Sequence, residues 1–152
     1  MAGFEHYAWL MKSEPSEVSV DDVLQMDGCK VGWFGVRNYQ ARNFMRDLCK
    51  IGDPVLFYHS SCAQPGIVGI GEIASEPYPD PTQFEETSGY FDAKSTQEKP
   101  RWVQVDVRVL HKVRLVSIAE LRTIPGCEGM RVLQKGTPHF QRLRLDRKSL
   151  MD

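Results

Sequence analysis

The segment from Trp102 to Leu110 constrains the fold more than any other part of the chain, because its apolar and polar residues alternate without a break. Four valines occupy every second position, with polar residues between them: Val103, Val105, Val107 and Val109 against Gln104, Asp106 and Arg108. Successive side chains of a β-strand point to opposite faces. We therefore expect the valines to face inward in a mostly antiparallel sheet, the kind of sheet that has one face in solvent.

Further strands and short helices are predicted around this segment. Apolar runs predict strands at 7–11, 55–59 and 67–73 and a last strand around 142–145. In the third of these runs, Gly69 and Gly71 indicate a bulge or the close approach of another backbone. Capping boxes that begin at Ser19 and Ser117 predict short helices directly after these residues.

A longer helix is predicted from Tyr39 to Leu48, because four apolar residues recur there at helical spacing (Ala41, Phe44, Met45 and Leu48). Asn38 is the expected N-cap, since its side-chain oxygen can accept a free backbone N–H of the first turn. Gly52 is the expected C-cap glycine.

The order of these elements favours an α+β fold with a curled, mostly antiparallel sheet. Residues 76–100 are rich in Pro, Asp, Ser, Thr and Glu but also contain aromatic residues, so we expect an ordered, packed excursion there. With 152 residues, the chain is expected to form one domain over 1–152, with a core that needs no staples.

The charge balance argues against binding of nucleic acid through bulk basicity, because the formal net charge is -1. A local basic patch remains compatible with that balance. One candidate is the C-terminal stretch that contains Arg131, Lys135, Arg142, Arg144, Arg147 and Lys148. The alternative interpretation of this stretch is a solvated, partly frayed tail.

The cysteines and histidines give no metal-ligand spacing. The four cysteines (Cys29, Cys49, Cys62 and Cys127) form no C-x-x-C pair, and the four histidines are equally scattered. We therefore expect no metal and free cysteines in a reducing, intracellular compartment. The common nucleotide-binding and hydrolytic motifs are absent, so no cofactor is expected, and no apolar run is long enough to span a bilayer.

The segment from Trp33 to Asn38 carries the residue types of a ligand site. It places an aromatic ring, a glycine, Arg37 and Asn38 directly before a helix N-terminus. These residues offer a stacking surface, room for close approach and hydrogen-bond donors beside the positive end of a helix dipole. Such a combination suits a planar, hydrogen-bonding ligand. The alternative is that Trp33 belongs to the core and Arg37 to the solvated surface.

Three segments in sequence order resemble the EVE domain, a branch of the PUA-like fold: 9–15 (WLMKSEP), 33–44 (WFGVRNYQARNF) and 57–60 (FYHS). The segments 78–84 (YPDPTQF) and 100–107 (PRWVQVDV) extend the resemblance, which reaches about Leu133. It implies a small PUA-like β-barrel with flanking short helices and a pocket for a modified nucleobase. EVE domains are similar to YTH domains, which hold a methylated base in an aromatic cage.

Matched by motif, the resemblance implies a base pocket formed by Trp9, Lys12, Ser13, Trp33, Gly35, Asn38, Tyr58, His59 and Ser60. Trp33 would supply the π face and Asn38 contacts to the base edge. Phosphate contacts are expected from Arg37, Arg42 and Arg46, and Lys12 is a further candidate. The chain departs from the family pattern at Phe34, where the family usually has Asp, and at 142–146, where its usual last strand reads differently.

The predicted function is that of a reader of a modified base, such as a modified cytosine, in DNA or RNA, acting as a monomer by default. The family that the chain resembles includes a nuclear protein, so the resemblance implies the nucleus if the source is eukaryotic. The resemblance also leaves open a hydrolase acting on a modified nucleoside, as in the related ASCH branch, with Lys12, Glu14 and His59 as its reactive groups. A third possibility is a protein-interaction module that uses the 78–84 loop.

Overall fold

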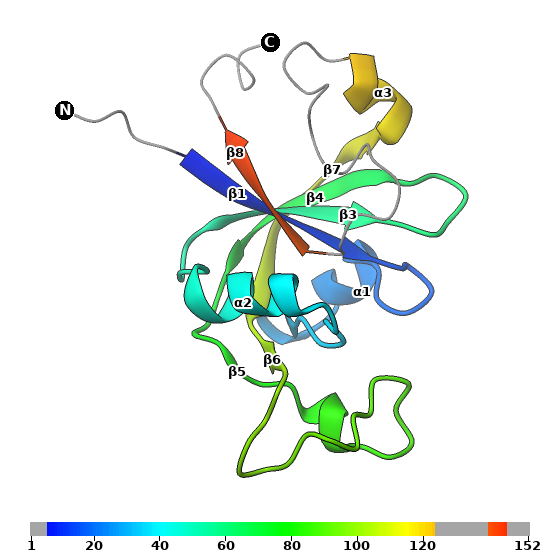
Figure 1. Cartoon of the computed structure of the whole chain (residues 1–152). Coiled ribbons are helices and arrows are strands. Elements are labelled where there is room, and N and C mark those ends of the chain that lie inside the picture. Colours follow the sequence, from blue (N-terminus) through cyan, green and yellow to red (C-terminus); the bar gives the residue numbers. More distant parts are fainter. Residues whose placement is uncertain (1–5, 124–139, 146–152) are drawn as a thin grey trace, which may run out of the picture.

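The computed structural model describes residues 6–123 and 140–145. In this part of the chain, six strands form one curled sheet in the order β2-β7-β4-β3-β1-β8 (Figure 1). Their bounds are β1 His6–Ser13, β2 Lys30–Gly32, β3 Pro54–His59, β4 Gly66–Ile73, β7 Asp106–Ser117 and β8 Phe140–Leu145. Every neighbouring pair is antiparallel except β1 and β3, which run parallel. The expected curled, mostly antiparallel sheet is therefore confirmed.

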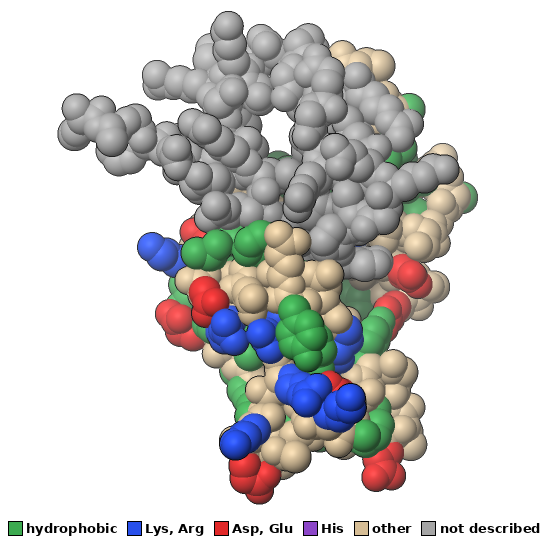
Figure 2. All heavy atoms as spheres, in the orientation of Figure 1, with side chains coloured by type: hydrophobic (Ala, Val, Ile, Leu, Met, Phe, Trp, Pro, Cys, Tyr) green, Lys and Arg blue, Asp and Glu red, His purple; other side chains and the backbone are tan. Residues whose placement is uncertain are grey.

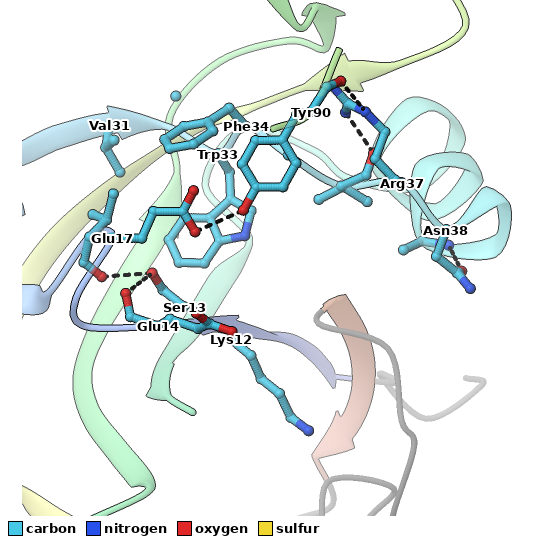
Figure 3. A pocket seen from close by; sticks show the side chains of 15 residues that line it. Lys12, Ser13, Glu14, Glu17, Val31, Trp33, Phe34, Arg37, Asn38 and Tyr90 are labelled. Atoms are coloured by element: carbon cyan, nitrogen blue, oxygen red, sulfur yellow. Dashed lines mark hydrogen bonds between the residues drawn. The ribbon is translucent and has the colours of Figure 1, made fainter. Parts of the chain in front are cut away.

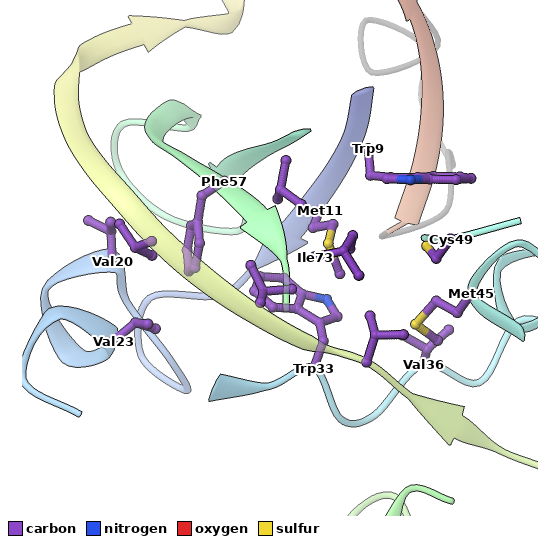
Figure 4. Packing of buried hydrophobic residues seen from close by; sticks show 14 of the residues in the cluster. Trp9, Met11, Val20, Val23, Trp33, Val36, Met45, Cys49, Phe57 and Ile73 are labelled. Atoms are coloured by element: carbon purple, nitrogen blue, oxygen red, sulfur yellow. The ribbon is translucent and has the colours of Figure 1, made fainter. Parts of the chain in front are cut away.

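Short helices flank this sheet. They are α1 Val20–Leu24, α2 Tyr39–Asp47 and α3 Ile118–Thr123, with 3-10 turns at Asp27–Cys29 and Pro81–Phe84. Val20 and Val23 of α1 pack into the same core as Met45 of α2 (Figure 4). Both helices lie between β1 and β3 in the sequence, and both contribute side chains to the core of the sheet. This part of the chain is therefore packed against the sheet. No helix in the described residues is both long and apolar enough to cross a bilayer.

The valine face of the 102–110 segment lies inward, as predicted. Val105, Val107 and Val109 are buried, and Val103 packs partly buried against the same core. The opposite face is less exposed to solvent than the alternation predicts, because Gln104 is buried as well. The reason is a second, two-stranded sheet that sequence reasoning missed, in which β5 (Tyr78–Pro79) pairs with β6 (Val103–Gln104). The main strand β7 then continues to Ser117, well beyond its predicted end.

Local signals predicted the helix starts correctly. The Ser19 hydroxyl and the Asp22 carboxylate form a complete capping box, and Asn38 Oδ1 accepts a hydrogen bond from the Ala41 backbone N–H. Ser117 Oγ accepts from the Glu120 N–H before α3. The expected C-cap at Gly52 is wrong, because α2 ends at Asp47 and Gly52 lies in a later turn.

The glycines of β4 do mark irregular pairing. The register with β7 shifts between Ile67 and Gly69 and again between Ile70 and Gly71. A Cβ atom at Gly71 would lie 2.2 Å from the carbonyl oxygen of Arg108, so the close approach of β4 and β7 here needs a residue without a side chain. The close backbone approach expected from these glycines is therefore confirmed.

The excursion between β5 and β6 is packed, as expected, and lies at the end of the molecule opposite α3 (Figure 1). Its centre is Gln83, which is fully buried and satisfies both ends of its amide. Its Nε2 donates to the carbonyl oxygens of Asp80 and Trp102, and its Oε1 accepts from the Trp102 N–H and the Ser95 hydroxyl. These bonds tie the two ends of the excursion together.

The predicted C-terminal basic patch falls largely outside the described residues. Arg131, Lys135, Arg147 and Lys148 lie outside them, whereas Arg142 and Arg144 belong to β8, which pairs antiparallel with β1. The last strand expected around 142–145 is confirmed.

Candidate functional site

A pocket of about 390 Å³ lies where the loop after β1, the segment after β2 and the excursion between β5 and β6 meet (Figure 3). Five of the residues predicted from the sequence line it: Lys12, Ser13, Trp33, Gly35 and Asn38. Arg37, predicted as a phosphate contact, lines it too. The remaining walls come from Glu14, Glu17, Val18, Val31, Gly32, Phe34, Val36, Ala41 and Tyr90. The volume is in the range typical of small-molecule sites in proteins.

Trp33 belongs to the pocket and to the core at the same time. Its side chain is only 6% exposed and meets Phe57 edge-on, with ring centroids 5.1 Å apart. The backbone N–H of Trp33 donates to the Val105 carbonyl oxygen at 2.8 Å, which holds the segment against the strand. The two interpretations that the sequence left open are therefore compatible, because a core residue can form the floor of a pocket.

Gly35 is required by the tight geometry of the pocket wall. Its φ is +83°, a left-handed conformation that favours glycine. A Cβ atom at this position would lie 2.8 Å from the Tyr90 ring. Its backbone N–H donates to Asp80 Oδ2 at 2.8 Å, so the turn is held by a carboxylate from the excursion.

Arg37 is a structural residue of the wall, and its predicted phosphate contact is not supported by its surroundings. Its Nη1 forms an ion pair with Asp80 Oδ2 at 3.0 Å, and the Asp80 side chain is fully buried. Its five N–H groups are all used, because they also reach the carbonyl oxygens of Val36 and Tyr90 and the hydroxyl of Thr82. A phosphate could bind Arg37 only by displacing one of these partners.

Asn38 has a free donor at the pocket. Its Oδ1 caps α2, whereas no hydrogen bond in the described part of the chain uses its side-chain nitrogen. Ser13 has a different role, because its hydroxyl donates to the Val18 carbonyl oxygen at 2.6 Å and so holds the loop after β1. Of these two polar side chains, Asn38 is the one with a side-chain donor that no described residue accepts from.

Lys12 is partly buried, and its side chain points away from the Trp33 indole (Figure 3). Burial lowers the pKa of its ammonium group. Its Nζ lies 5.5 Å from the centroid of the Tyr58 ring. Lys12 is thus a cation at the margin of the pocket.

Tyr90 closes one side of the pocket and was missed by sequence reasoning. Its hydroxyl donates to Glu17 Oε2 at 2.8 Å, which joins the excursion to the loop after β1 (Figure 3). Burial, followed by the hydrogen bond to Glu17, raises the pKa of Tyr90 to about 12, so the hydroxyl stays protonated at neutral pH. Phe34 meets the Tyr90 ring edge-on at 5.8 Å. The residue that departs from the family pattern therefore makes an apolar contact with this wall.

The family model of the EVE domain matches residues 7–149 of this chain. The chain belongs to the EVE domain family. Mouse thymocyte nuclear protein 1 is 43% identical over 125 residues, which cover 76% of this chain and 55% of the mouse protein. The chain therefore spans about half the length of the curated relatives it matches.

Solved structures resemble this EVE domain over nearly its whole length. A Pseudomonas syringae protein is 41% identical, with a TM-score of 0.84 over 95% of both chains. The human THYN1 protein, solved in complex with DNA containing 5-methylcytosine, is 35% identical, with a TM-score of 0.83 over 95% of this chain and 94% of its own. These likenesses confirm the expected PUA-like fold.

Four predicted pocket residues of this EVE domain do not line the cavity. Trp9 is 1% exposed, and its indole N–H donates to Asp53 Oδ2 at 3.0 Å. Tyr58 is buried in a separate apolar cluster, and the Ser60 hydroxyl is buried without a hydrogen-bond partner in the described structure. His59 Nε2 accepts from the Val20 backbone N–H at 3.1 Å, which ties β3 to α1.

The reactive set of the alternative hydrolase is not assembled in this EVE domain. Glu14 and Lys12 line the pocket, but His59 does not, and its Nε2 is already engaged by Val20. The 78–84 loop likewise uses its polar side chains within the protein, since Asp80 and Gln83 are fully buried. In the described residues, no group of His, Cys, Asp and Glu side chains could hold a metal ion.

Proposed function

We propose that this EVE domain binds DNA that carries 5-methylcytosine and holds the modified base in the pocket floored by Trp33. The observation that carries the proposal is the pocket itself, in which a buried indole and apolar walls lie beside the free amide donor of Asn38. The likeness to the human THYN1 protein, solved with DNA containing this base, supports the choice of ligand.

The walls suit a methylated pyrimidine. Val31, Val36 and Ala41 offer apolar surface for a methyl group, and the carboxylates of Glu14 and Glu17 are acceptors of the kind that suits a cytosine amino group. One methyl or methylene group in a hydrophobic pocket is worth about 1–3 kcal/mol. A base can reach such a pocket only after it has left the duplex stack, so we propose that the base is flipped out of the helix.

The test compares two duplexes that differ only at one cytosine, methylated or unmodified, by fluorescence anisotropy. We expect the methylated duplex to bind about 5- to 150-fold more tightly, which corresponds to the worth of the buried methyl group. Equal affinity for the two duplexes would overturn the proposal. A single-stranded RNA with the same modification, bound more tightly than the DNA, would move the proposal to RNA.

The matched variants are Trp33→Phe and Trp9→Phe, because both replace a buried indole by a smaller ring. Truncation of a core tryptophan to alanine costs about 3–5 kcal/mol of stability, so we choose the more conservative change and expect both variants to fold. Trp33→Phe should reduce the preference for the methylated duplex, whereas Trp9→Phe should leave it unchanged. Loss of preference in both variants would place the effect in stability and not in the pocket.

We further propose that the protein acts in the nucleus where the cell has one, following the name of its curated relatives. Imaging of the tagged protein tests this, and exclusion of the protein from the nucleus would contradict it.

A further inference from the structure

An exposed aromatic residue stands directly beside the pocket on the first turn of α2. Tyr39 follows Asn38, which lines the pocket, and Tyr39 is 51% exposed. Its ring stacks on Trp102, with centroids 4.8 Å apart and an interplanar angle of 27°. A half-exposed tyrosine at the margin of a ligand site has one face available for a partner.

Trp102 fixes the position of the Tyr39–Trp102 stack. It is 5% exposed, and its indole N–H donates to Asp92 Oδ2 at 2.7 Å. Its backbone N–H donates to the buried amide of Gln83. Tyr39 therefore rests on a ring whose position is determined by the packed excursion, so little side-chain freedom remains to be lost on binding.

Among the described residues, the ring contact of Tyr39 is with Trp102, and the cation near it is Arg42. The guanidinium carbon of Arg42 lies 4.7 Å from the Tyr39 centroid and 5.9 Å from the Trp102 centroid. A group on the outer face of Tyr39 would be much farther from Trp102, because the two rings are themselves stacked. Arg42 therefore flanks the stack at its edge, and in the described part of the chain the half-exposed Tyr39 ring has no second ring stacked on it.

Arg42 keeps its positive charge available. Its guanidinium donates to Asn43 Oδ1 and to the carbonyl oxygen of Arg101, which are both neutral acceptors. No carboxylate of a described residue lies within 4 Å of it. Arg46, one helical turn later, differs because it forms an exposed ion pair with Asp47 at 2.9 Å. Of the two predicted phosphate contacts on α2, Arg42 is the better placed.

The surroundings of α2 favour a polyanion. Figure 2 shows Lys and Arg side chains gathered around a hydrophobic side chain on the face that carries α2. The whole chain has a formal charge of -1, so this concentration of positive charge is local. An aromatic surface flanked by cations is the usual arrangement for contact with a nucleic-acid strand, in which bases stack and phosphates meet arginine.

We propose that Tyr39 and Arg42 form a second contact surface for the DNA strand, next to the base pocket. Tyr39 packs its open face against the nucleotide beside the flipped base, and Arg42 binds a phosphate of the same strand. This surface deepens the function proposed above and rests on it for the identity of the ligand. It contributes affinity without sensing the methyl group, because the modification is enclosed in the pocket.

The experiment measures the Kd of Tyr39→Ala for the methylated and the unmodified duplex by fluorescence anisotropy. We expect both duplexes to bind about 5- to 150-fold more weakly, the usual effect of removing one stacking contact, and the ratio of the two Kd values to stay unchanged. Tyr39→Phe should retain wild-type affinity. Phe91→Ala, which removes another exposed aromatic ring, is the control and should have no effect.

Arg42→Gln and Arg46→Gln form the second matched pair, because they remove the same charge from the same helix. Arg42→Gln should weaken both duplexes and reduce the slope of log K against log salt by about 1, the share of one phosphate. Arg46→Gln should change the slope less, since Asp47 already neutralises that charge. Wild-type affinity of a folded Tyr39→Ala protein for both duplexes would overturn the proposal.

The two proposals fail in different measurements. Equal affinity of the wild-type protein for the methylated and unmodified duplexes overturns the base pocket, yet the Tyr39 effect can still be measured on the unmodified duplex. A wild-type preference for the methylated duplex, combined with no effect of Tyr39→Ala, overturns the second surface alone. Thermal unfolding of each variant separates lost binding from lost folding.

Discussion

At the scale of single residues, Asp80 has the widest influence on the pocket wall. Its carboxylate, which has no exposure to solvent, accepts hydrogen bonds from the backbone N–H groups of Gly35 and Thr82 and neutralises Arg37. Without it, the backbone N–H groups of Gly35 and Thr82 and one N–H of Arg37 would lose their acceptor, so the wall depends on a residue that does not itself line the pocket.

We expect Asp80→Ala to lower the free energy of unfolding by about 3–5 kcal/mol, the usual cost of removing one partner of a buried ion pair. Asp47→Ala is the control, because Asp47 pairs with Arg46 in solvent, and its loss should cost no more than about 1 kcal/mol. Urea denaturation of the two variants measures the difference. Similar losses in both variants would show that burial of the Asp80 pair has no special weight.

At the scale of elements, the start of α2 serves two purposes. Asn38 caps the helix through its oxygen and is also one of the residues that line the pocket. We therefore expect this side chain to link helix stability to ligand contact, whereas Ser19 caps α1 outside the pocket lining.

Asn38→Ala should cost about 0.5–2 kcal/mol of stability, the usual worth of an N-cap, and should also weaken binding of the methylated duplex about 2- to 12-fold through the lost donor. Ser19→Ala should show a comparable loss of stability and unchanged binding. Chemical denaturation and anisotropy on the same samples separate the two effects. Unchanged binding by a folded Asn38→Ala protein would remove Asn38 from the reading of the base.

His59 links β3 to α1 in a way that depends on pH. Its Nε2 can accept the Val20 N–H only while the imidazole is neutral, and burial lowers its pKa from the ordinary value. A lowered pKa in the folded state means that the stabilisation is complete above the ordinary pKa of about 6.5 and is lost as the pH falls through the folded value.

We therefore expect the urea midpoint of the wild-type protein to fall between about pH 7.5 and about pH 5. His59→Gln should show a smaller fall, because a glutamine oxygen can accept the same hydrogen bond at either pH. His111→Gln, at an exposed position of β7, should follow the wild-type protein. If His59→Gln loses as much stability on acidification as the wild-type protein, the titrating group lies elsewhere.

At the scale of the whole molecule, a nearly neutral chain is proposed to bind a polyanion through a small number of local cations. Two of the three predicted phosphate contacts, Arg37 and Arg46, already form ion pairs within the protein. Electrostatic attraction should therefore supply only a modest share of the affinity.

We expect log K for the unmodified duplex to fall with log salt at a shallow slope, since each phosphate contacted adds about -0.9. Anisotropy titrations over a series of salt concentrations measure it. An affinity that does not change with salt would show that these cations do not meet phosphates. A steep slope would assign a larger role to the basic residues beyond β8.

The sequence alone determined the features that depend on near neighbours in the chain. The valine alternation predicted the inward face of the 102–110 segment, and Ser19 and Asn38 predicted two helix starts, because pleat and cap geometry involve residues only a few positions apart. The family motif then brought Lys12, Ser13, Trp33 and Asn38 into one expected pocket, which the structure also assembles.

Only the tertiary structure decided which of the predicted site residues line the cavity and which make structural contacts elsewhere in the fold. Arg37 lies 43 positions from Asp80, and Tyr90 lies 73 positions from Glu17, so no local pattern reveals either contact. The parallel pairing of β1 with β3 and the second sheet that buries Gln104 are equally non-local. The physical reason is that the environment of a side chain is set by residues distant in the sequence. Trp33 is both core and pocket wall because Phe57 packs against its ring and the other wall residues leave a cavity beside it.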